Sequence, residues 1–89
     1  MPTQTMEITN IKGLHARASA KFAEVCEGLN ATATVRKDGM DAGGDSIMGL
    51  LMLAASIGTF IEVETTGPDA GQLMTALSAL VADKFGEGD

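Results

Sequence analysis

Apolar and polar residues alternate in four short stretches of the chain, and a period of two predicts half-buried β-strands. The stretches are residues 5–9, 32–37, 40–42 and 59–66. In the first, Met6 and Ile8 fall on the same face. Between the second and third stands Asp38-Gly39, where both residues tolerate positive φ, so a two-residue hairpin is predicted there.

Three further stretches predict helices, two of them from apolar residues at helical spacing. The first runs from about 16 to 27 and ends at Gly28, the second covers 47–54 before Gly58, and the third has an apolar stripe over 70–81. Residues 47–54 could form a buried strand or a short helix on apolar content alone, but the preceding N-cap and the scarcity of β-branched residues favour a helix. Asp69 followed by Gln72 resembles a capping box at the start of the third helix. We expect Gly86 to end that helix and the acidic tail at 87–89 to fray. The apolar side of the first helix consists of Ala18, Phe22, Val25, Cys26 and Leu29.

The element order is therefore βαββαβα, and one-sided patterns in both strands and helices indicate an α+β fold. We expect a four-stranded antiparallel sheet with three helices on one face, forming a single domain over residues 1–89. With three Phe and no Trp or Tyr, the core must be aliphatic and rich in Met.

A net charge of −6 argues against binding to nucleic acid or to an anionic membrane surface. The longest apolar run, residues 47–55, is too short to span a bilayer, and residues 1–4 do not resemble a signal peptide. The single cysteine, Cys26, is expected to be a buried thiol in a reducing compartment. We therefore expect a cytoplasmic protein without membrane insertion.

The only histidine, His15, precedes the first helix, with Gly13 giving the loop its backbone freedom. A helix N-terminus offers unpaired N–H groups and a partial positive charge, so it binds anions and favours the neutral, nucleophilic imidazole. Arg17 can add a charge-assisted hydrogen bond to a phosphate, and Lys12 adds positive charge nearby. These residues indicate phosphoryl chemistry at His15.

Other interpretations stay open on the residues alone. A lone histidine in a small domain is more often a surface residue or a hydrogen-bonded core residue than a catalytic one, and Arg17 fits equally well as a solvated charge. A metal site is disfavoured, because Cys26 is the only other soft ligand and lies on the core side of its helix. No carboxylate is directed at His15 by the sequence, which also disfavours a serine-type triad.

Two motifs resemble the HPr family, the histidine-containing phosphocarriers of the phosphoenolpyruvate-dependent phosphotransferase system. Gly13-Leu14-His15-Ala16-Arg17 is similar to the active-site signature of the family. Asp45-Ser46-Ile47-Met48-Gly49-Leu50 is similar to its regulatory-serine signature. The resemblance extends over nearly the whole chain, because length, element order and the spacing of the two motifs all agree.

The resemblance implies an HPr-like open-faced β-sandwich and a carrier that is not an enzyme and uses no cofactor or metal. It implies that His15 accepts a phosphoryl group on Nδ1 from phosphorylated enzyme I and passes it to enzyme II A domains. Arg17 and the backbone N–H groups of Ala16 and Arg17 would hold that group. One position departs from the family pattern: Ala18 stands where a proline is usual, so we expect a slightly more mobile first turn with retained chemistry.

Ser46 precedes the second helix and is by position alone an N-cap. The resemblance implies that a dedicated kinase, the HPr serine kinase/phosphorylase, phosphorylates it and so regulates docking. The second helix is apolar nearly all round, so part of it must be exposed; Leu50 and Leu53 are expected in the core. The residues expected to dock partners are Ala20, Ile47, Met48, Leu51 and Met52.

Two alternatives to the carrier remain. One is a regulatory protein-binding module that is controlled by Ser46 and carries little phosphoryl flux through His15. The other is a small α+β domain in which His15 only caps the helix. Within the carrier hypothesis, a sugar-uptake branch and a nitrogen-linked regulatory branch are both compatible with the sequence, and we expect a monomer.

Overall fold

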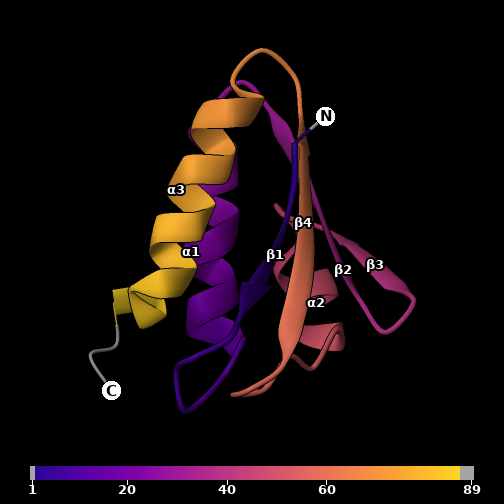
Figure 1. Cartoon of the computed structure of the whole chain (residues 1–89), viewed down its shortest axis with the longest axis vertical. Helices are drawn as coiled ribbons and strands as arrows, with labels where there is room; N and C mark the ends of the chain where they lie inside the picture. The colour runs from indigo at the N-terminus through magenta and orange to yellow at the C-terminus, as the bar shows by residue number, and fades with distance from the viewer. Residues whose placement is uncertain (1, 87–89) are drawn as a thin grey trace.

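The computed structural model describes residues 2–86, and over this range it confirms the predicted α+β order of strands and helices. One antiparallel sheet has the strand order β1-β4-β2-β3, and α1 and α3 lie side by side against it (Figure 1). The tail at 87–89, predicted to fray, lies outside the described residues. The elements are β1 (Thr3–Glu7), α1 (Ala16–Glu27), β2 (Thr32–Lys37), β3 (Met40–Gly43), α2 (Ile47–Met52), β4 (Phe60–Thr66), α3 (Ala70–Ala82) and a short 3-10 turn, η1 (Lys84–Gly86).

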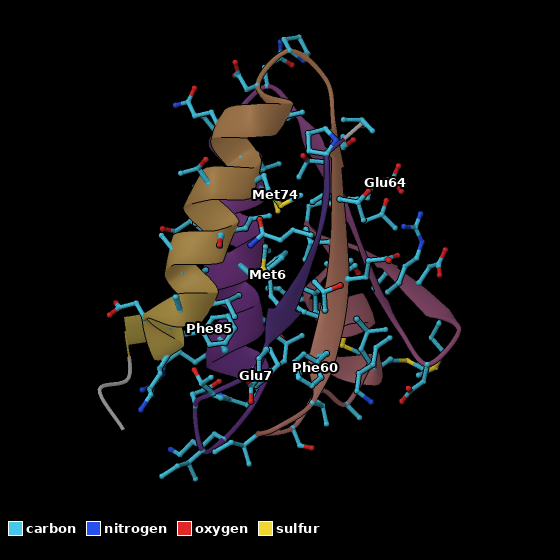
Figure 2. All side chains as sticks on the ribbon, in the orientation of Figure 1. Met6, Glu7, Phe60, Glu64, Met74 and Phe85 are labelled. Carbon is cyan, nitrogen blue, oxygen red and sulfur yellow. The ribbon has the colours of Figure 1, made fainter. Side chains whose placement is uncertain are left out.

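The core lies between the sheet and the helices. β4 pairs with β1 on one side and with β2 on the other, and its alternate residues Ile61 and Val63 are buried. Met6 and Met74 point into the layer between β1 and α3, whereas Glu64 points away from the helices (Figure 2). Burial on one face only is what the period-two pattern predicts for a sheet covered on one side.

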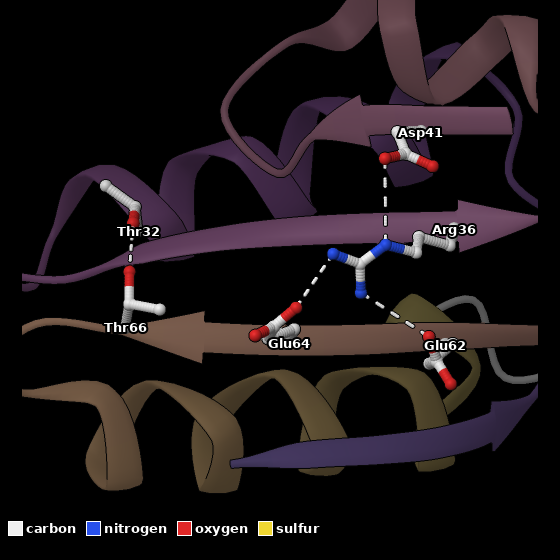
Figure 3. A network of polar contacts seen from close by, with 6 residues as sticks. All are labelled: Thr32, Arg36, Asp41, Glu62, Glu64 and Thr66. Carbon is white, nitrogen blue, oxygen red and sulfur yellow. Dashed lines mark hydrogen bonds and ion pairs between the residues drawn. The ribbon is translucent and has the colours of Figure 1, made fainter. Parts of the chain in front are cut away.

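The opposite face of the sheet is polar and is organised around Arg36. Its guanidinium group contacts Glu64 at 2.8 Å, Glu62 at 3.4 Å and Asp41 at 3.6 Å (Figure 3). The hydrogen bond that Arg36 donates to the Glu64 carboxylate raises the pKa of Arg36, and the cationic side chain bridges β2, β3 and β4. These contacts tie three strands together on the solvent side.

Two local predictions are confirmed closely. The first helix spans Ala16–Glu27 as expected, and Asp38 and Gly39 have φ values of 51° and 81°, as the hairpin signal required. Gly28 does end the helix as its C-cap, but with a right-handed φ of −81°. Gly28 therefore ends α1 without adopting the left-handed backbone conformation that glycine allows.

Some predicted boundaries are wrong. β1 occupies Thr3–Glu7 rather than 5–9, because pairing with β4 extends over polar residues that show no alternation. β3 runs one residue further, to Gly43. α2 ends at Met52 rather than Ala54, since Ala54 takes a left-handed φ of 53° and breaks the helix before Gly58 is reached.

The end of the chain also differs from the prediction. α3 stops at Ala82, and the 3-10 turn that follows reaches Gly86 and buries Phe85 completely. The predicted capping box is wrong as well: Asp69 is the N-cap of α3 but makes no side-chain cap bond. Its carboxylate instead accepts the N–H of Asn30 at 2.9 Å, which joins the start of α3 to the loop before β2.

Candidate functional site

His15 is the N-cap residue of α1, with an extended backbone at φ −78° and ψ −177°. Its Nδ1 accepts the backbone N–H of Arg17 at 3.3 Å, and its carbonyl accepts the N–H of Ser19 at 2.8 Å. A neutral imidazole that accepts at Nδ1 carries its proton on Nε2. The lone pair of Nδ1 is therefore directed at the positive end of the helix, where an anion is also stabilised.

No acidic side chain of the first helical turn offsets the positive end of α1. Lys12 and Arg17 are close to His15 in the sequence, and both are exposed. A negatively charged group placed on Nδ1 would lie by the backbone N–H groups of the first turn, and no carboxylate of this turn would repel it.

Two buried polar residues hold the backbone around His15, and the sequence analysis did not single them out. Asn10 is fully buried and donates from Nδ2 to the Gly13 carbonyl at 2.8 Å. Ser19 is equally buried and donates from Oγ to the Leu14 carbonyl at 3.3 Å. Two features of the sequence indicate these roles. Asn10 begins a turn that ends in Gly13, and Asn is a common turn residue. Ser19 falls on the apolar side of α1, where a buried hydroxyl needs a hydrogen-bond partner.

The loop before His15 is also fastened to the connection between α2 and β4. The Leu14 N–H donates to the Ala55 carbonyl at 2.8 Å. Gly13 has a φ of 65°, and a Cβ at this position would lie 2.4 Å from the Ala55 oxygen. Glycine is therefore required at this position both for its backbone angle and for the close approach of the two segments.

Ser46 is the N-cap of α2, as predicted, and its Oγ accepts the N–H of Gly49 at 3.0 Å. The side chain is exposed. A hydroxyl in this position can be reached by another protein without any opening of the fold. A phosphate on it would lie at a helix start, where negative charge is tolerated.

The helix α2 packs against α1 and presents an apolar surface to solvent. Met48 and Met52 are each 70% exposed and Ile47 is 42% exposed, whereas Leu50 and Leu53 are in the core as expected. Leu51 and Ala20, the other two residues expected to dock partners, are only half-buried. The structure thus brings the helix that begins at His15 and the apolar helix that begins after Ser46 into contact.

Ala18 is completely buried in the first turn of α1. As the third helical residue it precedes the first N–H that has an intrahelical acceptor, that of Ser19. A proline here would therefore cost no helical hydrogen bond.

A model of the protein family described as "PTS HPr component phosphorylation site" matches residues 2–83. The chain belongs to the HPr family. It is 47% identical over 89 residues to the phosphocarrier protein HPr of Neisseria meningitidis, with 100% of both chains covered. It is 42% identical over 85 residues to the phosphocarrier protein NPr of Escherichia coli K12, with 94% of both chains covered.

The structural comparison agrees with this family. The crystal structure of HPr-C-His from Thermoanaerobacter tengcongensis superposes with a TM-score of 0.93 at 36% identity, covering 98% of each chain. The chain is accordingly an HPr/NPr-type phosphocarrier of the phosphotransferase system, a family that works with enzyme I and enzyme II. Within residues 2–86, no cluster of three His, Cys, Asp or Glu side chains could hold a metal ion, and no helix is long and apolar enough to cross a bilayer.

Proposed function

We propose that Nδ1 of His15 accepts a phosphoryl group from phosphorylated enzyme I and passes it to an enzyme II A domain. The observation that carries the proposal is the position of Nδ1 at the N-terminus of α1, 3.3 Å from the N–H of Arg17. That atom has a lone pair available in the neutral ring, and it lies where a helix stabilises an anion. The membership of the chain in a family of phosphocarriers supports the same assignment.

The transfer balances without a cofactor. The Nδ1 lone pair forms a bond to phosphorus while the bond from phosphorus to the donor atom of enzyme I breaks, and its electron pair stays on that atom. Nε2 keeps its proton. The N–H of Arg17, released from Nδ1, then donates to a phosphoryl oxygen together with the N–H of Ala16, and the Arg17 guanidinium adds a further charge-assisted bond.

Weak holding of the phosphoryl group suits a carrier. The bonds available are a few backbone N–H donors and one exposed arginine, with no metal ion in the proposed site. Such bonds stabilise the phosphorylated state only modestly, so transfer to enzyme II A remains reversible. We infer that the chain acts as a stoichiometric carrier, as a single domain and as a monomer in the cytoplasm.

The test is incubation with phosphoenolpyruvate and a matched enzyme I. The expected product carries one acid-labile, base-stable phosphate, and the substitution His15→Ala abolishes the label while the circular dichroism spectrum is retained. Arg17→Ala serves as the graded control, because it removes the guanidinium group and leaves the acceptor atom. Absence of label on the unmodified chain, or label that survives His15→Ala, contradicts the proposal.

We further propose that Ser46 is the target of an HPr serine kinase/phosphorylase and that its phosphorylation weakens docking at α2. Exposure of the hydroxyl and its position beside Ile47 and Met48 support this assignment. A phosphate adds nearly two negative charges beside the apolar surface, which repels acidic partners. Incubation with that kinase and ATP should label the unmodified chain and leave Ser46→Ala unlabelled.

The exposure of the Ser46 hydroxyl beside Ile47 and Met48 also supports a second function. In this function the chain is a regulatory module in which α2 binds partners under the control of Ser46. His15→Ala separates the two functions. Partner regulation that persists at full strength in this variant favours the module, and its loss together with phosphoryl transfer favours the carrier. Pull-down of sugar-specific or nitrogen-linked enzyme II A domains distinguishes the two branches.

A further inference from the structure

The backbone carbonyl of Gly13 connects a buried side chain to His15. It accepts Nδ2 of Asn10 at 2.8 Å and the N–H of His15 at 2.9 Å. Asn10 has no exposed surface, so its carboxamide is held inside the protein. The Gly13 oxygen is therefore hydrogen-bonded both to Asn10 and to His15, the residue that we assign as phosphoryl acceptor, so the position of Asn10 affects that of His15.

The peptide group between Gly13 and Leu14 is held at both ends. Its carbonyl accepts from Asn10 and His15, and its N–H donates to the Ala55 carbonyl at 2.8 Å. The turn is closed by a further bond of 3.2 Å from the N–H of Gly13 to the carbonyl of Asn10. All these partners are either main chain or fully buried, so the peptide plane has a single orientation in the folded protein.

This restraint matters because Gly13 supplies none of its own. With a φ of 65° and no Cβ, it can pass between left-handed and right-handed regions more readily than any other residue. A rotation of the peptide would remove the acceptor of the His15 N–H and turn the capping residue. Nδ1 would then move away from the first turn of α1, where it now lies 3.3 Å from the Arg17 nitrogen.

We propose that Asn10 is a positioning residue for phosphoryl transfer at His15, acting through the Gly13 carbonyl. The inference rests on the proposed function of His15 as acceptor. Asn10 touches neither the phosphoryl group nor the imidazole in this mechanism. It sets the direction from which Nδ1 meets an incoming phosphorus atom.

Two variants of Asn10 remove the bond in different ways. Asn10→Ala deletes the carboxamide and leaves a cavity. Asn10→Leu keeps a similar volume in apolar form, and the Gly13 carbonyl still accepts from the His15 N–H, so that carbonyl is not left without a donor. If the alanine variant does not fold, the leucine variant provides the same test.

A matched control is Thr65→Val. Thr65 is also fully buried, and its Oγ1 donates to the Ala70 carbonyl at 2.9 Å. This bond joins β4 to the start of α3, at the other end of the molecule from the loop that precedes α1 (Figure 1). The substitution deletes a buried hydrogen bond of similar kind without touching the loop before His15.

The experiment measures phosphoryl transfer from enzyme I with each variant as the variable substrate, at a temperature where all are folded. For both Asn10 variants we expect kcat to fall by about 10- to 100-fold, the scale expected when a reacting atom is displaced. KM should stay within about twofold, because the exposed residues of α2 are unchanged. Thr65→Val should keep both parameters.

Amide hydrogen exchange at His15 is the second readout and does not depend on activity. The Asn10 variants should exchange this N–H faster relative to their global stability, and Thr65→Val should not. Wild-type kcat in a folded Asn10 variant overturns the inference, as does unchanged exchange at His15. If the unmodified chain is not labelled at all, the proposed function fails, and the exchange result alone then decides whether Asn10 positions His15.

Discussion

Gly13 is the residue at which the loop before His15 comes closest to another segment. An added Cβ would lie 2.4 Å from the Ala55 oxygen and 2.9 Å from Cα of Ser56, both main-chain atoms that cannot move aside cheaply. The contact spans about 40 positions of sequence, so no local pattern predicts it. A glycine in a turn was predictable; the reason that only glycine fits was not.

For Gly13→Ala we therefore expect a loss of stability from two causes. The left-handed φ costs roughly 1–2 kcal/mol for an alanine, and the overlap with Ala55 adds about 1–3 kcal/mol. Gly39→Ala is the control, because Gly39 also has a positive φ but nothing lies within 4 Å of its Cβ position. Urea denaturation should show a larger loss at Gly13, and equal losses would contradict the predicted clash.

Ala54 presents the opposite case, an alanine where the backbone favours glycine. It follows Leu53, the C-cap of α2, is exposed, and has a φ of 53°. We expect Ala54→Gly to raise the free energy of unfolding by about 0.5–1 kcal/mol, since glycine relieves the left-handed strain at C′. In the exposed interior of α3, Ala79→Gly should lower it by about 1 kcal/mol. A parallel loss in both variants would argue against strain at Ala54.

At the scale of elements, the helices differ in what holds them. α1 has twelve residues and a clear apolar side, so its bounds follow from the sequence. α2 has six, which is too short for helical propensity to stabilise it alone. Its end is set by the left-handed Ala54, and its start depends on the Ser46 cap.

We expect Ser46→Ala to lower the free energy of unfolding by about 1 kcal/mol, because the N–H of Gly49 loses its acceptor. Ser46→Asp should retain most of the stability, since aspartate caps a helix as well as serine does. Thermal denaturation followed by circular dichroism measures both. If the aspartate variant is as unstable as the alanine variant, negative charge at this helix start is not tolerated, and phosphorylation at Ser46 would have to disturb the fold.

The capping box predicted at α3 is wrong because a tertiary contact gives the Asp69 carboxylate another partner. Asp69 and Gln72 have the spacing of a reciprocal cap, yet the Asp69 carboxylate accepts the N–H of Asn30. A side chain that can satisfy either of two backbone groups takes the one that tertiary packing brings closer. Local spacing cannot predict that choice.

At the scale of the whole molecule, folding buries the Cys26 side chain of α1 against the segment before α2. Its side chain is 5% exposed, and Gly44 passes so close that a Cβ there would lie 2.8 Å from Sγ. Burial, with a smaller contribution from Asp45, raises the pKa of the Cys26 thiol from 9.0 to about 11. The thiol therefore stays protonated in the folded protein at neutral pH.

A raised pKa makes stability depend on pH in a defined direction. Below pH 9 the thiol is mostly protonated in both the folded and the unfolded chain, so its ionisation does not lower the free energy of unfolding. As the pH rises from 9 towards about 11, the unfolded chain ionises first and the free energy of unfolding falls. Urea denaturation between pH 8 and pH 11 should show a steeper fall for the unmodified chain than for Cys26→Ala. Parallel curves would contradict the pKa shift.

The pattern of residues by itself determined the α+β order, the helix over Ala16–Glu27, the Asp38-Gly39 hairpin and the place of His15 at a helix start. These features depend on periodicity and on the backbone preferences of single residues, which act over a few positions of the chain.

Only the tertiary structure decided the bounds of β1, the partner of the Asp69 carboxylate and the bonds that hold the loop before His15. Each depends on atoms that are distant in sequence, such as the Leu14 nitrogen and the Ala55 oxygen. Asn10 shows the difference most clearly, because its residue type predicts a turn, while its burial against the Gly13 carbonyl follows only from packing of the whole chain.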